Sequence, residues 1–498
     1  MTMRRFRATF SPILFSPIPL LYCVLSLGLL MRVWRLLMNY SLWLDESSLA
    51  LNVLSRNFSE LTEPLSGSQA APVLFLWLSK ATTVISDSDS ELSLRLVPFL
   101  SGLAAFLVFY FCCKQVLNSS GTLIGLALFA FSPSLIDFSA EAKQYSTDVF
   151  VSVVVAYIGF LLISTQSRLI LLASIFIPCV LVWLSYPTPF LLSAIGVVGI
   201  FQAWLRKDKI KVYYLSVAIF MWVVSFIAFY LISLEEITRR QDLVDYWQEM
   251  HDAFMPLGGG SVFWLASKGK ELLTLPALGP LVIMLPMALA GVIIIALRDW
   301  RQALIVLLPI FVTIAASALK MYPFADRLIL FLVPQVILLV AISVEALLMM
   351  KWRHVGLILS SIAVSALLIH PIRWSAALIL RPGTFEKENF RDVLAKVLNS
   401  SECRSRIFIY ESARNHYSYY HLYRGFDNDG TAKVVSQLEI RNLVSERPSC
   451  FWILYCHVPK VREDSITEVL TNGRYRPVSH ISKIGADAAL YIIRERAE

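Results

Sequence analysis

The chain has 498 residues, of which 57% are apolar and only 16% are charged, and its mean hydropathy is +0.65. Because a soluble globular domain carries about 25% charged residues, this composition excludes a soluble protein and indicates a polytopic membrane protein. The net charge of +8 is typical of basic cytoplasmic loops, and no aromatic–basic interleaving indicates nucleic-acid binding.

The chain begins with a basic segment containing Arg4, Arg5 and Arg7, which predicts a cytoplasmic N-terminus. The first apolar run, from about Ile13 to Met31, is long enough to span a bilayer. Ten further spans are expected, which gives about eleven transmembrane helices. They end near residues 111, 135, 163, 186, 206, 233, 298, 320, 351 and 370.

The first outer loop contains two short apolar stretches, Leu49–Leu54 and Pro72–Ile85, of which the longer has about a dozen residues. Both are too short to span easily, so we interpret them as interfacial helices on the outer surface. The short loops at 114, 168, 206–211, 298–301 and 351–354 are basic, which predicts that they are cytoplasmic. The polar segments at 45–46, 137–148, 234–275 and 322–327 then fall on the outer side, as does the C-terminus.

In residues 371–498, strand-like segments alternate with helical segments. This pattern predicts a small extracytoplasmic α/β domain after a membrane domain at 1–370. Strands are expected at Arg404–Tyr410, Cys450–Tyr455 and Ala488–Ile493, with a short helix at Ser465–Leu470. No Gly-rich phosphate loop occurs in this tail, so nucleotide binding is not indicated.

Two groups of tail residues leave alternatives open. A pair among Cys403, Cys450 and Cys456 could form a disulfide if the tail is extracytoplasmic. An aromatic cluster could stack on a sugar or belong to the domain core, and core is favoured. Its members are His416, Tyr417, Tyr419, Tyr420 and His421.

Adjacent carboxylates, Asp45 and Glu46, follow the first span, with Trp43 just before them at a position that suits the membrane–water interface. A carboxylate at this depth is costly to desolvate and usually has a partner or a function. The alternative is that the two acids only begin the next helix.

A second polar patch includes Glu141, Lys143, Tyr145 and Asp148. If this stretch opens a helix, Glu141, Tyr145 and Asp148 lie at i, i+4 and i+7 on one face. The alternative is a solvated helix start with acids favoured by the helix dipole.

A third patch is Arg327, with Tyr322 and Lys320. Its alternative is an interfacial cation beside an aromatic anchor. Carboxylates beside cations at headgroup depth suit a lipid-linked sugar phosphate: the cations would hold the phosphate, and a carboxylate would take the proton of an attacking hydroxyl.

The sequence resembles the GT-C glycosyltransferases, in the bacterial branch related to protein O-mannosyltransferases and lipid A aminoarabinose transferases. The resemblance covers the membrane part. Lys143 stands where the family more often has arginine, which keeps the charge but loses bidentate phosphate geometry. The segments that carry the resemblance are Leu42-Trp43-Leu44-Asp45-Glu46, Gln69-Ala70-Ala71-Pro72, Glu91-Leu92-Ser93-Leu94-Arg95, Glu141-Ala142-Lys143-Gln144-Tyr145 and Tyr322-Pro323-Phe324-Ala325-Asp326-Arg327.

The resemblance implies Asp45 as the catalytic base, with Glu46 orienting it or helping to bind a metal. It implies Glu141 as a further carboxylate of the site and a direct, inverting displacement. Metal use varies across the family, so a divalent metal is one option, with Glu46 and His251 as the candidate ligands. The alternative for His251 is a solvated loop histidine. The substrate-binding candidates are Lys143, Tyr145, Asp148, Tyr322 and Arg327.

The function expected is therefore transfer of a hexose or pentose from a polyprenyl-phosphate donor to an acceptor hydroxyl on a lipid, glycan or protein. The expected location is the bacterial inner membrane. Two alternatives stay open: a polysaccharide polymerase or ligase that uses lipid-linked glycans, and a flippase for lipid-linked sugars. A flippase would place ionisable residues near the bilayer midplane, whereas here they collect at one surface.

Overall fold

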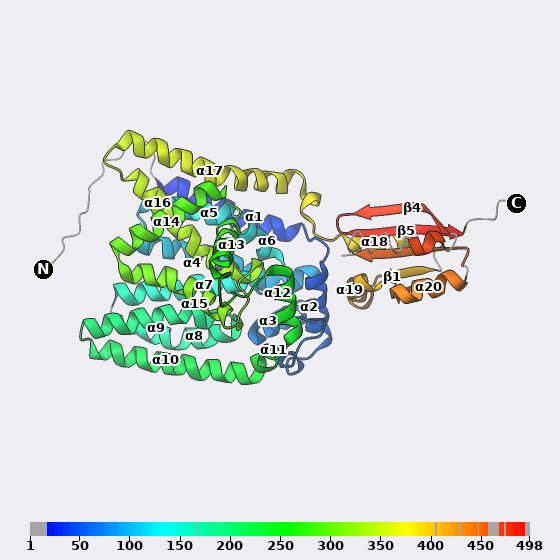
Figure 1. Ribbon diagram of the computed structural model, residues 1–498, viewed down its shortest axis with the longest axis horizontal. Coiled ribbons are helices and arrows are strands. Elements are labelled where there is room, and N and C mark those ends of the chain that lie inside the picture. Colours follow the sequence, from blue (N-terminus) through cyan, green and yellow to red (C-terminus); the bar gives the residue numbers. More distant parts are fainter. Residues whose placement is uncertain are drawn as a thin grey trace.

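The computed structural model describes residues 17–165, 167–403, 406–427, 430–446, 448–456, 468–472 and 475–493. A large helical bundle is followed by a smaller domain built on a β-sheet, which sits at one end of the bundle (Figure 1). The predicted class, a polytopic helical membrane protein with a small C-terminal α/β domain, is confirmed.

Within the described residues, nine helical segments are long and apolar enough to cross a membrane. A pair bent by 59°, α5 (Ser119–Phe131) with α6 (Pro133–Asp137) and η2 (Phe138–Ala140), would be a tenth. The 17-residue apolar helix α8 (Arg168–Leu184) matches the remaining span expected from the sequence. The nine are α1 (Pro17–Leu37), α4 (Glu91–Val116), α7 (Tyr145–Ser164), α9 (Thr188–Leu205), α10 (Lys209–Phe229, continuing to Thr238), α14 (Leu281–Arg298), α15 (Trp300–Ala318), η4 with α16 (Asp326–Leu332 and Val333–Leu348) and α17 (Arg353–Leu380).

The first helix ends six residues later than the expected end at Met31, and residues before 17 lie outside the described part. The reason is that its arginines are buried in the bundle. Arg32 donates to the backbone carbonyls of Gly28 at 2.9 Å and Phe129 at 3.2 Å, and Arg35 pairs with Asp137 at 2.7 Å. Since their charges are satisfied inside the protein, they do not end the helix.

The bundle is built around its most buried helices. In the most apolar stretch of α7, 72% of the residues are buried, and in that of the η4–α16 segment 94% are buried. The corresponding fraction is 22% in both α10 and α14. Helix α14 packs closely on α16 at Gly291, where a Cβ would overlap the carbonyl of Leu339. The segment that begins with Tyr145 and the one that contains Arg327 therefore share the rigid centre of the molecule.

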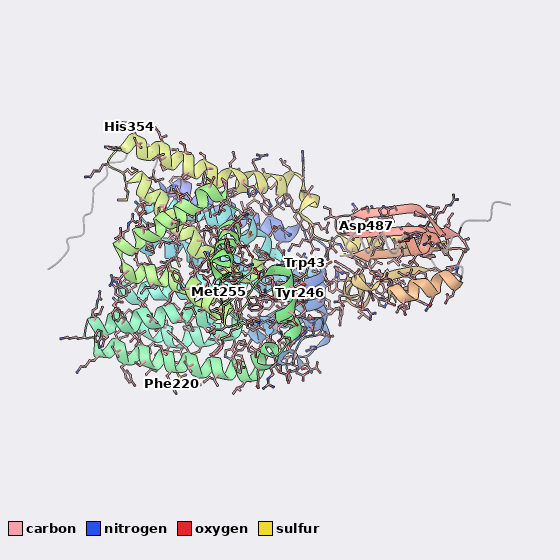
Figure 2. The ribbon with its side chains drawn as sticks, in the orientation of Figure 1. Trp43, Phe220, Tyr246, Met255, His354 and Asp487 are labelled. Atoms are coloured by element: carbon pink, nitrogen blue, oxygen red, sulfur yellow. A yellow bond between two sulfur atoms is a disulfide. The ribbon has the colours of Figure 1, made fainter. Side chains whose placement is uncertain are left out.

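Short helices gather at the end of the bundle that carries the sheet domain (Figure 1). Between α1 and α4 they are α2 (Leu44–Ser55) and α3 (Val73–Ser86), at the two stretches expected to be interfacial. The excursion at 234–275 adds α11 (Glu235–Thr238) and α12 (Gln241–His251), whereas its third helix, α13 (Ser261–Thr274), lies nearer the middle of the bundle. Figure 2 shows Trp43 and Tyr246 at this end and His354 at the other.

The C-terminal domain has a mixed five-stranded sheet with strand order β2-β1-β3-β5-β4. Strand β1 runs parallel to β2 and β3, and β5 is antiparallel to β3 and β4, so that Trp452 of β3 lies between Ile407 and Leu490. The elements are α18 (Phe390–Leu398), β1 (Ile407–Tyr410), α19 (Arg414–Arg424), β2 (Ala432–Val435), α20 (Gln437–Glu446), β3 (Cys450–Cys456), β4 (Tyr475–Lys483) and β5 (Ala486–Ile493).

The three strands expected from the sequence are present over their described residues, and positions 404 and 405 of the first lie outside the described part. Strands β2 and β4 were not expected. Strand β2 has only four residues, and β4 is mostly exposed and contains Pro477, so neither has the apolar pattern of a buried strand. The expected helix at 465–470 is helical over its described residues, 468–470, and its first three residues lie outside the described part. A disulfide joins Cys403 and Cys450, as one of the expected pairings.

Candidate active site

Three segments far apart in the sequence meet at Arg327. Its guanidinium donates one hydrogen bond to Asp45 Oδ2 at 2.5 Å and another to the Tyr145 hydroxyl at 2.9 Å. Asp45 lies in the first turn of α2, Tyr145 is the first residue of α7, and Arg327 is in η4. The side chains of Asp45 and Arg327 remain 22% and 15% exposed, so a reactant can reach this ion pair.

Aromatic rings surround the guanidinium of Arg327. Its central carbon lies 5.1 Å from the ring centroid of Trp43, 5.7 Å from that of Tyr145 and 5.6 Å from that of Trp247. Each is a favourable cation–π distance. Trp247 belongs to α12, so the polar excursion between α10 and α14 forms part of the wall of the site.

Lys143 is buried beside this pair, and its ammonium donates a hydrogen bond to the side-chain oxygen of Gln69. Burial lowers the pKa of Lys143 to about 8, with Asp45 opposing and Arg327 reinforcing the shift. The next residue, Gln144, bonds the carbonyl of Ala70 at 3.2 Å. The segment before α3 therefore holds the loop that precedes α7.

Glu46 has a different environment from its neighbour Asp45. Both of its oxygens are held by Arg95, at 2.9 and 2.7 Å, and Oε1 also accepts from the backbone N–H of Ala142 at 2.6 Å. Burial alone would raise the pKa of Glu46, but Arg95 and these hydrogen bonds lower it. The Glu46 carboxylate is 1% exposed, so it ties α2 to α4 and to the loop before α7.

The expectation that Glu141, Tyr145 and Asp148 share a helix face is wrong for Glu141. Helix α7 begins at Tyr145, and Glu141 has an extended backbone with φ −115° and ψ 137°. Its carboxylate instead pairs with Lys387 Nζ at 2.6 Å. Burial raises the pKa of Glu141, although Lys387 opposes the shift.

The remaining predicted residues lie around this centre. Asp148 is buried on α7, one helical turn beyond Tyr145. Tyr322 is also buried, and its hydroxyl donates to the carbonyl of Leu328 at 2.8 Å. His251 ends α12 with its ring 4.7 Å from that of Trp247, and burial lowers its pKa.

Sequence reasoning missed Lys387. This residue lies in the connection between α17 and α18, with its ammonium 4.2 Å from the ring centroid of Trp43 and its side chain 41% exposed. The residues on each side hold it in place: Glu386 accepts from the N–H of Ser41 at 2.9 Å, and Glu388 accepts from that of Leu44 at 2.7 Å. The one available signal was the charge run Glu-Lys-Glu at 386–388.

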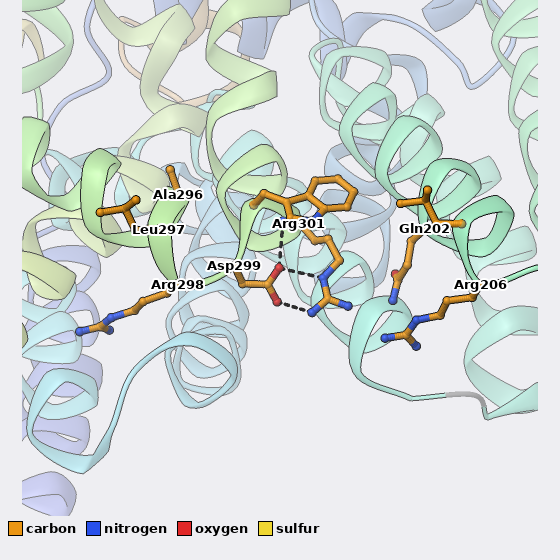
Figure 3. Close-up of a pocket in the computed structure, with 9 residues that line it drawn as sticks. Gln202, Arg206, Ala296, Leu297, Arg298, Asp299 and Arg301 are labelled. Carbon is orange, nitrogen blue, oxygen red and sulfur yellow. Dashed lines mark hydrogen bonds and ion pairs between the residues drawn. The ribbon is translucent and has the colours of Figure 1, made fainter. Parts of the chain in front are cut away.

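A hollow of about 340 Å³ lies at the other end of the bundle (Figure 3). It is lined by Arg206, Arg298, Arg301 and Asp299, among others, and Asp299 pairs with Arg301 at 2.6 Å. These residues belong to the loops predicted to be cytoplasmic. The hollow is therefore separate from the cluster around Asp45.

Among the described residues, the group of His, Cys, Asp and Glu side chains close enough to share a metal ion consists of Glu388, His416 and Cys456. Glu46 and His251, the ligands considered from the sequence, are not in it. Four residues of the predicted aromatic cluster belong to the core, as favoured: His416, Tyr417, Tyr419 and Tyr420 are buried. The fifth, His421, is only half-buried and stacks on the ring of Tyr417.

The fold is similar to that of a solved bacterial membrane protein, ArnT, so the fold expected from the resemblance is confirmed. The apo crystal structure of ArnT from Cupriavidus metallidurans superposes with a TM-score of 0.55 at 11% identity, over 95% of this chain and 98% of ArnT. The structure of ArnT bound to undecaprenyl phosphate gives a TM-score of 0.54 with the same identity and coverage. Likeness at this identity establishes the fold alone. No family model matches the sequence, and no curated protein matches it.

Proposed function

We propose that this chain is a membrane glycosyltransferase that moves a sugar from a polyprenyl-phosphate donor to an acceptor hydroxyl at the outer face of the membrane in which it lies. The observation that carries the proposal is the partly exposed Asp45–Arg327 pair, which places a general base beside a cation at the end of the bundle. The GT-C fold supports the same class of chemistry.

In the proposed step, the acceptor oxygen attacks the anomeric carbon while the bond from that carbon to the phosphate oxygen breaks. Asp45 accepts the hydroxyl proton, and the polyprenyl phosphate leaves with the electron pair of the broken bond. A one-step displacement of this kind inverts the anomeric configuration. Asp45 suits the role because its carboxylate is partly exposed, whereas Glu46 is buried against Arg95.

Three cations suit the phosphate. Arg327 can offer planar N–H donors, and two ammonium groups lie nearby: Lys143, which interacts electrostatically with Asp45, and Lys387, which lies beside Trp43. Together they would stabilise the charge that develops on the leaving group. That ArnT is found bound to undecaprenyl phosphate supports a lipid phosphate as the donor class.

The test is transfer by the purified protein, using a panel of undecaprenyl-phosphate-linked hexoses and pentoses with lipid, glycan and peptide acceptors. We expect release of undecaprenyl phosphate and a product of inverted configuration. Arg327→Gln should lower the rate by about 100-fold or more because it removes the charge at the leaving group. The matched control is Arg239→Gln, since Arg239 is 74% exposed and pairs only with Glu235 among the described residues.

Absence of transfer with every donor, together with absence of undecaprenyl-phosphate binding by folded protein, would contradict the proposal. Binding and translocation of a lipid-linked sugar without transfer would favour a flippase. Transfer of a whole lipid-linked glycan rather than one sugar would favour a polymerase or ligase.

A further inference from the structure

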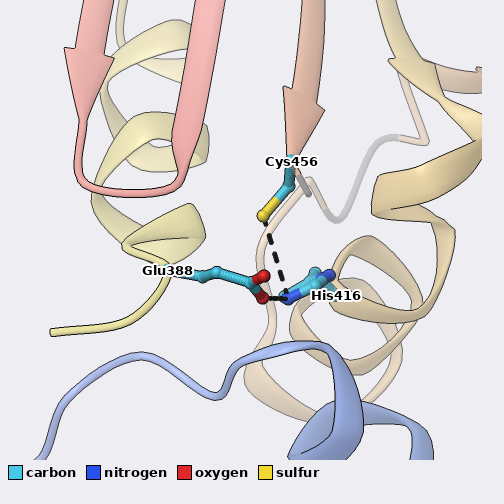
Figure 4. A group of neighbouring side chains, drawn as sticks. All are labelled: Glu388, His416 and Cys456. Atoms are coloured by element: carbon cyan, nitrogen blue, oxygen red, sulfur yellow. Dashed lines mark hydrogen bonds and ion pairs between the residues drawn. The ribbon is translucent and has the colours of Figure 1, made fainter. Parts of the chain in front are cut away.

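Three side chains that the proposed reaction does not use meet where the C-terminal domain joins the bundle (Figure 4). Glu388 precedes α18, His416 is on α19, and Cys456 ends β3. All three are buried, and one ligand atom from each lies within 4.8 Å of the others. His416 Nε2 is 2.8 Å from Glu388 Oε2 and 3.9 Å from Cys456 Sγ.

We propose that Glu388, His416 and Cys456 form a binding site for a zinc-type divalent cation. A thiolate, an imidazole and a carboxylate are the ligands that Zn²⁺ takes in proteins, and three protein ligands leave one position open. Around a tetrahedral Zn²⁺, nitrogen and oxygen ligands are separated by roughly 3.3 Å, and sulfur and nitrogen by roughly 3.6 Å. The His416–Glu388 and His416–Cys456 distances are within about half an ångström of these values, and the Glu388 and Cys456 ligand atoms lie within 4.8 Å of each other. Side-chain rotations would therefore suffice to bring the three ligands to one ion.

The buried position of the imidazole gives a second reason to infer a metal. His416 is fully buried, and its Nε2 faces both Glu388 and Cys456. Burying a carboxylate is costly unless it is paired or coordinates a metal. A cation shared by the three groups would offset that cost.

The position of the site connects it to the helix that carries Asp45. Glu388 Oε2, which faces His416, also accepts the N–H of Leu44. The N-cap residue of α2, Trp43, provides no side-chain cap, so Glu388 supplies an acceptor at this helix start. A bound cation would fix the carboxylate and thereby fasten the C-terminal domain to the start of α2.

The experiment is metal analysis by mass spectrometry of full-length protein purified in detergent with a tag that contains no histidine. Wild type, grown with zinc, should retain about one equivalent of zinc per chain after dialysis. Cys456→Ser and Glu388→Gln should each bring the metal to background, since each removes one ligand with little change of shape. The control, Cys23→Ser, removes an exposed thiol on α1 and should retain the metal.

Cobalt supplies a spectroscopic check that does not depend on transfer activity. After chelation and reconstitution with Co²⁺, wild type and Cys23→Ser should show thiolate-to-cobalt charge-transfer absorption, and Cys456→Ser should lack it. Zinc at background in the wild type, or equal metal and equal cobalt absorption in wild type and Cys456→Ser, would overturn the proposal. Neither result would bear on whether Asp45 acts as a base.

Discussion

Asp45 and Glu46 are adjacent in the sequence, yet α2 directs their carboxylates into different surroundings. Asp45 shares a partly exposed ion pair with Arg327, and Glu46 is enclosed with Arg95. The family resemblance implied different roles for the two carboxylates, but the residues alone could not divide them, because the division depends on Arg95, some fifty residues away. The structure favours Glu46 as a positioning residue for the loop that carries Lys143.

Replacing Glu46 with glutamine should destabilise the protein by about 3–5 kcal/mol, because it leaves the guanidinium of Arg95 buried without a counter-charge. We expect a fall of several degrees in the melting temperature in detergent, measured by intrinsic fluorescence. Glu63→Gln, at an exposed position of the same loop, is the matched control. Equal melting temperatures for both variants would show that the Glu46–Arg95 pair contributes little.

Lys143 should give donor binding a distinctive pH dependence. Burial lowers its pKa to about 8, so the ammonium is charged below that pH and neutral above it. If Lys143 holds the donor phosphate, KM for the donor should rise as the pH increases through about 8. Lys143→Arg should abolish this rise because the guanidinium stays protonated. A KM profile that is unchanged in Lys143→Arg would exclude Lys143 as the titrating group.

At the scale of elements, helix α2 is held from outside the bundle. Ser41 and Leu42, just before it, bond the hydroxyl of Tyr420 at 3.0 and 3.1 Å, and Ser48 within it accepts a hydrogen bond from Asn415 at 2.8 Å. Both partners are on α19 of the C-terminal domain. The domain therefore helps to position the helix that carries the proposed base.

Tyr420→Phe removes one hydroxyl and both of its hydrogen bonds to the 41–42 segment. We expect a local loss of about 1–2 kcal/mol, seen as faster backbone hydrogen exchange over residues 41–48. Tyr423→Phe, on the same helix, should leave the exchange of this segment unchanged. Equal exchange in the two variants would mean that Tyr420 does not fasten the domain to α2.

At the scale of the whole molecule, the polar segments predicted to be outside gather at one end of the bundle, and the basic loops lie at the other (Figures 1 and 2). We predict that the end with Asp45 and the C-terminal domain is extracytoplasmic. In intact cells, a membrane-impermeant thiol reagent should label Glu63→Cys and leave Lys351→Cys unlabelled until the cells are lysed. The unmodified chain gives the background, and the reverse labelling pattern would invert the topology.

Much of this architecture follows from apolar runs and loop charge, which are local properties of the sequence. The meeting of Asp45, Tyr145 and Arg327 could be anticipated because each lies at the outer end of a predicted span. The position of Lys387 could not be anticipated, because it depends on how the C-terminal domain contacts the bundle. Glu141 was misplaced because a helix pattern alone does not show that α7 begins four residues later, at Tyr145.

The most direct test of the account is the transfer rate of Asp45→Asn beside its affinity for undecaprenyl phosphate. The amide keeps the size of the side chain but cannot accept the proton, so we predict a fall in kcat of about 100-fold or more while the lipid phosphate still binds. Glu63→Gln, assayed in parallel, should keep the wild-type rate. A variant Asp45→Asn that transfers sugar at the wild-type rate would contradict the assignment of Asp45 as the base.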